Sequence, residues 1–157
     1  MTERQAILYS IKNDTLFATQ YFFRQNEGRS FNVGDHHKRI AAALDRVFAG
    51  ECRRLIINCP PRYSKTEMAV KAFIAKGLAL NPASKYIHLS YSASLALDNS
   101  ERTKDIVASD WYQELFPYVQ IKQDSKAKQK WYTTAGGGVY ATSSAGQVTG
   151  FGAGIVE

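Results

Sequence analysis

Hydrophobic and polar positions along the first fifty residues recur with the period of amphipathic helices. Asp14 is placed to cap a helix whose aromatic face consists of Phe17, Tyr21 and Phe22. Gly28–Ser30 breaks that helix, and Asp35 is placed to cap the next one. The inward stripe of this second helix consists of Ile40, Ala43, Leu44, Val47 and Phe48. Gly50 stands where a left-handed helix terminator belongs, so the pattern predicts a helical amino-terminal section over residues 1–50.

After residue 50 the pattern changes to short apolar runs that alternate with helical stretches. Leu55–Asn58 is predicted to be a buried strand, which Pro60–Pro61 ends because proline cannot continue a central strand. A helix is predicted from Lys65 to Leu78. The elements expected beyond it are a strand over Tyr86–Ser90, helices over 93–109 and 111–116, and a strand pair over 131–134 and 138–142. This order predicts an α/β fold, with a parallel sheet flanked by helices.

Length and composition narrow the class of protein. The 157 residues suit about one domain, and 45% hydrophobic with 22% charged residues is an ordinary globular balance. Disordered, collagen-like and disulfide-scaffold classes are therefore excluded. No apolar run reaches about 18 residues and the first residues lack a secretory signal, so no membrane-spanning helix is expected. Cys52 and Cys59 have no metal or redox spacing, and we expect reduced, buried thiols of a cytoplasmic protein.

The net charge of +6 permits a polyanionic partner without requiring one. Four lysines are close together in the sequence, with Asp124 among them: Lys122, Lys126, Lys128 and Lys130. This run is either a solvated loop or a contact for the DNA backbone. The serines of Ser90–Ser94 likewise either cap the following helix or donate to DNA phosphates. His36 and His37 have no acid or cysteine at ligand spacing, so packing at the helix start is expected rather than a metal site.

The segment most informative about chemistry is Asn58–Glu67, which joins the expected strand to the expected helix. That is the setting of a phosphate-binding loop, because amides at a helix start face outward and the helix dipole favours an anion there. In the pattern G-x-x-x-x-G-K-[ST], Lys65 is the lysine that reaches the outer phosphates. Thr66 is the hydroxyl residue that ligates Mg²⁺. Arg62 adds a second cation able to contact the terminal phosphate.

Both glycines of that pattern are replaced, the first by Cys59 and the second by Ser64. A serine that begins a helix needs no positive φ, so Ser64 weakens the match to the phosphate-loop pattern without removing it. The alternative interpretation of these ten residues is a proline turn followed by a helix with a solvated lysine.

Several blocks of sequence occur in a recognisable order along nearly the whole chain. They are Tyr21–Phe23, the helix from His36–His37 to Ala49–Gly50, Leu55–Glu67, Tyr91–Ala96, Trp111–Pro117 and Gly137–Ala153. In these blocks the sequence resembles the large subunit of tailed-phage terminases, the ATP-driven motors that package double-stranded DNA into capsids. The Pro-Pro-Arg-x-x-Lys-Thr-Glu form of the loop is more specific than the generic phosphate-loop pattern.

The resemblance implies an ATPase domain of the helicase-like P-loop class that binds ATP with Mg²⁺. By position, Arg62 and Lys65 are the implied catalytic residues, Thr66 is the implied magnesium contact, and Tyr21–Gln25 would lie near the adenine. The implied nucleotide-binding residues are Pro61, Arg62, Tyr63, Ser64, Lys65, Thr66 and Glu67. The implied partners are double-stranded DNA, the terminase small subunit and the portal protein, in the cytoplasm of a bacterial host and without a membrane.

Residues 51–157 are expected to form a partial P-loop core. In the family, the loop matching Thr142–Ala153 leads into an acidic strand that holds Mg²⁺ and polarises the attacking water. Gly154–Glu157 has two apolar residues where a buried strand needs about four or more. We therefore expect the catalytic acid to be missing and the chain to be an amino-terminal terminase fragment that hydrolyses little ATP.

Two alternatives stay open. One is a helicase-type translocase. The Pro-Pro-Arg before the lysine favours the terminase over this alternative. The other is a non-catalytic module that binds DNA or a partner protein, which the loss of both loop glycines favours.

Overall fold

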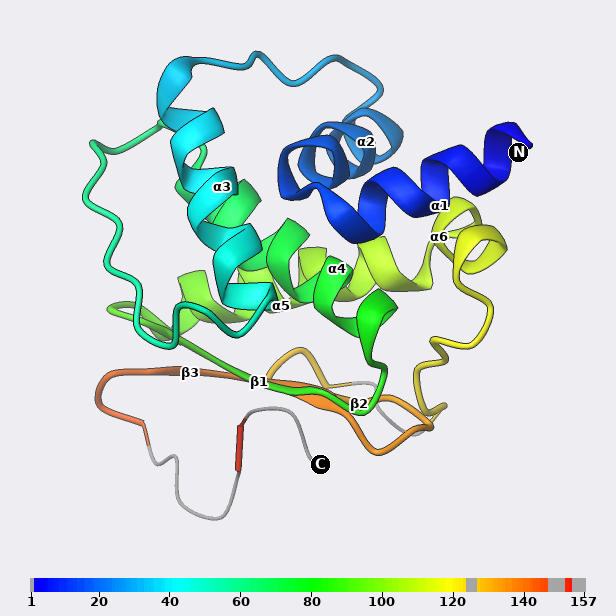
Figure 1. The fold of residues 1–157 in the computed structure, drawn as a ribbon. Helices are drawn as coiled ribbons and strands as arrows, with labels where there is room; N and C mark the ends of the chain where they lie inside the picture. The colour runs from blue at the N-terminus through cyan, green and yellow to red at the C-terminus, as the bar shows by residue number, and fades with distance from the viewer. Residues whose placement is uncertain (1, 124–126, 147–151, 154–157) are drawn as a thin grey trace. The chain divides into compact units, whose positions relative to one another are not determined.

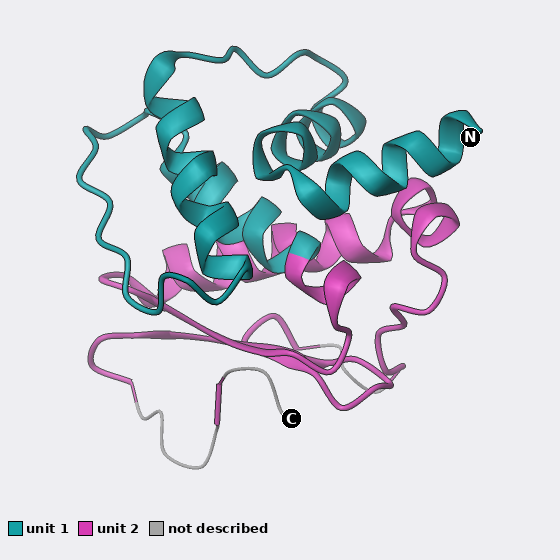
Figure 2. Cartoon of the chain, viewed as in Figure 1, with its two compact units in different colours: residues 1–76 teal, residues 77–157 magenta. Residues whose placement is uncertain are grey.

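The computed structural model describes residues 2–123, 127–146 and 152–153 of a mixed α/β chain (Figure 1). The chain divides into two compact units, residues 1–76 and 77–157 (Figure 2). The boundary predicted at residue 50 lies inside unit 1. Unit 1 contains three α-helices, a π-helical turn and the first half of α4 (Phe73–Leu80), and unit 2 contains the rest of α4 with the sheet and its helices.

Two capped helices open unit 1. In α1 (Glu3–Asn13), the Thr2 hydroxyl accepts from the backbone N–H of Gln5, whose side chain accepts from the Thr2 N–H in return. In α2 (Thr15–Glu27), the Asp14 carboxylate accepts from the N–H groups of residues 16 and 17, as the sequence predicts. Gly28 ends α2 with a φ of 68°, a left-handed conformation that glycine adopts without a Cβ clash.

The third helix, α3 (Asp35–Phe48), contributes Ile40, Ala41 and Leu44 to a buried apolar cluster of unit 1. Its N-cap is Gly34 rather than the expected Asp35, which instead lies in the first turn. Gly50 follows the helix with a φ of 76°, as its place in the sequence predicts. The other members of this buried cluster are Phe31 and Met68.

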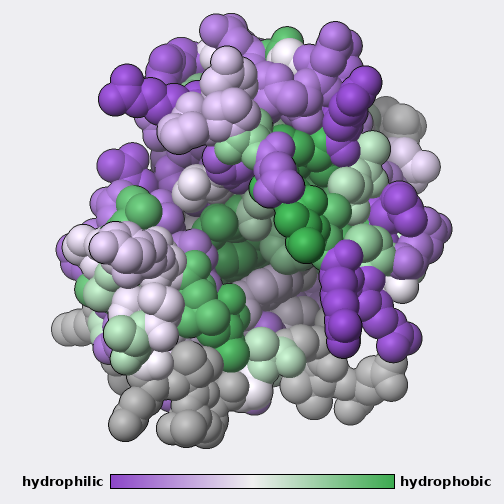
Figure 3. Space-filling view, turned by 90° about the vertical axis from the view of Figure 1, so that its left-hand side faces the viewer, coloured by the Kyte–Doolittle hydropathy of each residue, from purple (hydrophilic) through white to green (hydrophobic). Residues whose placement is uncertain are grey.

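The strand predicted at Leu55–Asn58 is wrong: these residues lie in the irregular segment between α3 and the next helix. Ile56 is 86% exposed, while Ile57 packs against the core of unit 1. Three apolar residues between an arginine pair and a proline pair are fewer than a buried strand usually contains. Here only Ile57 packs against the cluster, and no strand forms. Figure 3 faces the side on which this segment runs in Figure 1, and apolar side chains reach the surface there among hydrophilic ones.

Unit 2 contains a three-stranded sheet in the order β1-β3-β2. Strand β1 (Lys85–Ser90) pairs in parallel with β3 (Gly138–Ser143), and β2 (Lys130–Tyr132) pairs antiparallel with β3. The three strands predicted beyond residue 80 are thus confirmed, but the sheet is mixed rather than parallel. A two-residue-period pattern identifies strands, whereas the direction of pairing depends on contacts far apart in sequence.

Helix α5 (Ala93–Ala108) packs against the sheet, and α6 (Asp110–Leu115) follows it. The Trp131 indole N–H donates to the Ser100 hydroxyl of α5 at 3.1 Å. On β1, the His88 Nε2 lies 3.2 Å from the Asn99 amide nitrogen of the same helix. Trp131 and Val139 occupy paired positions and both are fully buried, so the tryptophan, α5 and β3 share one core.

We expect the Gly137→Ala variant to lose about 1–3 kcal/mol of unfolding free energy, the usual effect of overpacking. A Cβ at Gly137 would lie 2.3 Å from the Pro82 carbonyl oxygen and 2.6 Å from that of Ser84. Both are backbone atoms, so the clash cannot be relieved by turning a side chain. Urea denaturation measures the loss, and Gly152→Ala is the control because nothing lies within 4 Å of its added Cβ. Equal midpoints for the two variants would contradict the close approach.

Candidate phosphate-binding loop

The candidate site is the turn that precedes the π-helix η1 (Glu67–Ala72) in unit 1. Two residues of this turn, Arg62 and Ser64, have φ values of 66° and 57°. The expectation that Ser64 needs no positive φ is therefore wrong. The helical turn begins only after this residue, whose carbonyl accepts from the Met68 N–H at 3.2 Å.

The conformation of Ser64 fits the glycine position that it occupies in the phosphate-loop pattern. A left-handed conformation costs an ordinary L-residue roughly 1–2 kcal/mol, and glycine is the residue that avoids this cost. Left-handed residues beside helical ones turn successive N–H groups toward a common side, which forms an anion-binding concavity. The second glycine position is thus left-handed although a serine occupies it, whereas Cys59, at the first glycine position, has no positive φ.

Lys65 folds back across the loop. Its ammonium donates to the Cys59 carbonyl and, at 2.9 Å, to the Pro60 carbonyl. These two bonds close the turn and hold the positive charge over it. An arriving phosphate therefore has to replace carbonyl oxygens as the partner of this ammonium.

The other predicted loop residues differ in exposure and in whether their side chains form hydrogen bonds. Arg62 and Thr66 are exposed, and within the described residues no hydrogen bond to either side chain is formed. Glu67 instead accepts a hydrogen bond from Lys71, a residue in the last turn of η1 that is 6% exposed. The cation and hydroxyl expected to contact a nucleotide are accessible, while the one carboxylate on the loop is already paired.

The turn lines an open hollow of about 390 Å³. Its lining consists of Pro61, Arg62, Tyr63, Ser64, Lys65, Thr66 and Glu67. These are the residues that the sequence predicts as nucleotide-binding, and the structure brings all of them together around one space. π-Helical turns such as the one that follows are rare and frequently occur at functional sites.

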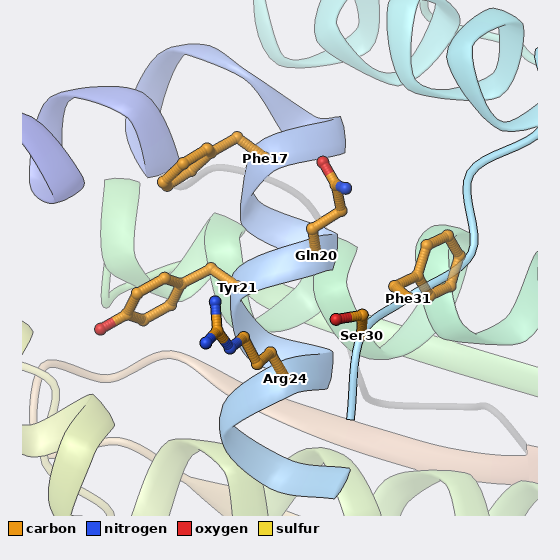
Figure 4. Close-up of a pocket in the computed structure, with 6 residues that line it drawn as sticks. All are labelled: Phe17, Gln20, Tyr21, Arg24, Ser30 and Phe31. Atoms are coloured by element: carbon orange, nitrogen blue, oxygen red, sulfur yellow. The ribbon is translucent and has the colours of Figure 1, made fainter. Parts of the chain in front are cut away.

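A second hollow of unit 1, about 230 Å³, lies on α2 and the segment after it (Figure 4). It is lined by Phe17, Gln20, Tyr21, Arg24, Ser30 and Phe31. Of the segment predicted to lie near adenine, Tyr21 and Arg24 line this hollow, whereas Phe22 is buried in the core and Gln25 is exposed. Sequence reasoning missed Gln20, although its four-residue spacing from Arg24 places both on one helix face.

The basic segment of unit 2 is engaged in contacts of its own. Lys128 forms an ion pair with Glu101 of α5 at 2.7 Å. Lys122 and Lys130 lie 6.0 and 5.5 Å from the centre of the Tyr132 ring. Lys126, like the predicted loop residues Gln147 and Thr149 and the segment 154–157, lies outside the described residues. Contact with a nucleic-acid backbone stays a prediction.

Two further expectations concern the serines before α5 and the two cysteine thiols. Ser92 accepts from the Leu95 N–H at 3.5 Å and is the N-cap of α5, so the capping interpretation is confirmed. Cys52 and Cys59 are free thiols, but they are half-buried rather than buried because the segment that carries them is largely exposed.

Across the described residues, no group of three or more histidine, cysteine, aspartate or glutamate side chains is arranged to hold a metal ion. None of the helices in those residues is long and apolar enough to cross a bilayer. Compared with models of protein families, with curated proteins and with solved structures, the chain matches none of them.

Proposed function

We propose that the turn Pro61–Glu67 binds the phosphates of ATP with Mg²⁺, and that the chain belongs to a DNA-packaging motor of the terminase large-subunit type. The observation that carries the proposal is the left-handed Ser64, at the second glycine position of the phosphate-loop pattern and directly before Lys65 and Thr66. A left-handed serine raises the conformational free energy of the folded chain, and strained backbone of this kind clusters at ligand sites.

In this proposal each group of the loop has a distinct task. The backbone amides after Ser64 donate to phosphate oxygens, and Lys65 exchanges its carbonyl partners for the outer phosphates. Arg62 supplies the second cation. The described residues offer no carboxylate cluster, so Mg²⁺ would be held by the phosphates and the Thr66 hydroxyl. When bound, the ion neutralises phosphate charge.

Other parts of the proposal rest on the sequence resemblance. The adenine is assigned to the neighbourhood of Tyr21, whose ring lies 6.1 Å from that of Phe17 and offers an aromatic face. Double-stranded DNA, the small subunit and the portal protein are the partners that such a motor requires. Slow hydrolysis is likewise an expectation from the resemblance, in which the catalytic acid belongs to an acidic strand after the loop matching Thr142–Ala153.

A second candidate is a non-catalytic binding module with a vestigial loop. Two observations favour it. Within the described residues no strand leads into the turn, and the Lys65 ammonium is already satisfied by two backbone carbonyls. In this candidate the lysine stabilises the turn and binds no phosphate.

Calorimetric titration with Mg-ATP tests the proposal. We expect the wild type to bind and Lys65→Ala to bind about 10- to 100-fold more weakly, because a charge-assisted hydrogen bond contributes about 1.5–3 kcal/mol. Ser64→Gly should bind at least as tightly as the wild type, since glycine adopts the same φ without the left-handed cost. Lys128→Ala is the matched control, because its exposed ion pair lies in unit 2.

The outcomes separate the two candidates. Negligible heat for both the wild type and Lys65→Ala would contradict nucleotide binding and leave the vestigial loop. Equal, measurable binding by the two would place the nucleotide elsewhere on the chain. Binding gained only in Ser64→Gly would identify the serine as the lesion that made the loop vestigial.

A further inference from the structure

His36 and His37 form a close pair of rings at the start of α3, with centroids 3.8 Å apart and planes tilted by 44°. His37 is 5% exposed, and its Nδ1 accepts a hydrogen bond from the Gly34 N–H at 2.8 Å. A nitrogen that accepts carries no proton, so this bond requires a neutral His37 with its proton on Nε2. The helix start is thus built around an uncharged imidazole.

The histidine pair touches the tip of the candidate phosphate-binding loop. The His36 ring meets the Tyr63 ring edge-on, with centroids 5.2 Å apart and planes at 69°. Tyr63 stands between Arg62 and Ser64, the two residues with left-handed backbone. The His37 ring also packs against the Phe31 ring, with centroids 4.9 Å apart. The Phe31 ring in turn packs against the Phe23 ring, with centroids 5.3 Å apart. The contact therefore joins the loop tip to the core of unit 1.

The pair is poorly arranged to carry charge. The Nε2 atoms of both rings are buried, with no hydrogen-bond partner in the described residues. Burial, and then the neighbouring His36, lower the pKa of His37, against an opposing effect of the Tyr63 backbone. The charged groups around the pair are Asp35 and Lys38, which form an exposed ion pair at 3.4 Å on α3, together with Arg62 on the loop and Arg29, which lies over Phe23.

We infer that His36 and His37 are positioning residues that hold Tyr63, and with it the left-handed turn at Arg62 and Ser64, only while the His37 imidazole is neutral. Protonation of His37 at Nδ1 removes its acceptor for the Gly34 N–H. Losing this bond loosens the start of α3 and the ring pair that contacts Tyr63, and it lets the loop leave its strained conformation.

The direction of the pH dependence follows from the lowered pKa. The folded chain binds the His37 proton less tightly than the unfolded chain does, so stability rises with pH through this range. The contribution of the histidine pair is complete above the ordinary value of 6.5 and is lost as the pH falls through the lower folded pKa. A loop that is ordered at neutral pH would thus become disordered in acid.

The test reads the loop itself by NMR, without a nucleotide. We expect the amide shifts of residues 63–65 and the φ-sensitive amide coupling of Ser64 to change between pH 7.5 and pH 5. The change should disappear in His37→Asn, which offers an amide oxygen to the Gly34 N–H, and should persist in His36→Phe, which keeps both His37 and a ring against Tyr63. His88→Gln is the control because it removes the third histidine, which lies in unit 2. Loop shifts that titrate identically in all four proteins, or that do not titrate in the wild type, would overturn the inference.

A consequence for nucleotide binding rests on the proposed function, and the two can fail separately. Mg-ATP affinity should fall about tenfold per pH unit below the His37 pKa, because only the neutral fraction is competent. Comparing the wild type with His37→Asn at each pH cancels the protonation of ATP itself. A loop that titrates in a protein that never binds ATP would refute the proposed function and support the histidine pair. ATP binding with the same pH profile in both proteins would refute the pair and support the function.

Discussion

Replacing Lys76 by alanine should lower the unfolding free energy of unit 1 by about 3–5 kcal/mol, the usual cost of breaking a buried ion pair. Lys76 is 1% exposed, and its ammonium donates to the Asp45 carboxylate at 3.0 Å and to the Thr15 hydroxyl at 2.9 Å. The same ammonium lies 4.7 Å from the centre of the Phe48 ring. One side chain therefore ties α4 to the start of α2 and to the end of α3.

The effect should be large because Asp45 serves the same junction. Its carboxylate also accepts from the backbone N–H of Thr15 at 3.0 Å and from the hydroxyl of that residue. Without Lys76, a partly buried carboxylate loses its counter-charge and a cavity opens beside Phe48. Burial already lowers the pKa of Lys76 against the opposing effect of Asp45, so the ammonium is held in an environment that tolerates it only when paired.

Urea denaturation measures the loss, and a second lysine–aspartate pair supplies the control. Lys38 and Asp35 are 3.4 Å apart, with side chains 63% and 92% exposed. Lys38→Ala should change stability by less than about 1 kcal/mol, as is usual for surface pairs. Lys76→Met, which refills the cavity without the charge, should lose less than Lys76→Ala. A loss for Lys76→Ala no larger than that of Lys38→Ala would contradict the buried network.

Features set by neighbours in sequence could be predicted, since their causes are local. Asp14 caps α2 because its carboxylate needs only the N–H groups two and three residues ahead. Gly28 and Gly50 end their helices because a left-handed residue is needed there. The strand at Lys85–Ser90 was equally accessible to sequence reasoning, from its run of apolar and β-forming residues.

Features set by distant residues could not be predicted. Nothing within ten residues of Leu55 shows that only Ile57 of that run packs on the core of unit 1. Lysine is usually exposed, and the burial of Lys76 is explained by two partners far away in the chain, Asp45 and Thr15.

The candidate site shows the same division. Lys65 and Thr66, the lysine and the hydroxyl residue of the phosphate-loop pattern, can be identified directly in the amino-acid sequence. The left-handed φ of Ser64 is a property of the folded turn, and sequence reasoning expected the opposite. The contact of Tyr63 with His36 joins residues far apart in the chain, which no spacing rule connects.

Replacing Trp131 by alanine should destabilise unit 2 by about 3–5 kcal/mol, in the range of large-to-small changes at buried aromatic positions. Trp131 is fully buried on β2, a strand of three residues whose ladder contributes few hydrogen bonds. Most of the attachment of β2 must therefore come from this side chain. Far-UV circular dichroism during urea denaturation is the suitable measurement, because the substitution removes a fluorophore.

Two further variants separate the packing of Trp131 from its hydrogen bond. Trp131→Phe keeps much of the apolar volume but leaves the Ser100 hydroxyl, 1% exposed, without its indole donor. Adding Ser100→Ala should recover part of the loss, because an unpaired buried hydroxyl costs about 1–3 kcal/mol. Trp111→Ala, at the half-buried second tryptophan, should cost less than Trp131→Ala. Equal losses at the two tryptophans would mean that β2 is held by its backbone ladder after all, and that Trp131 only fills space.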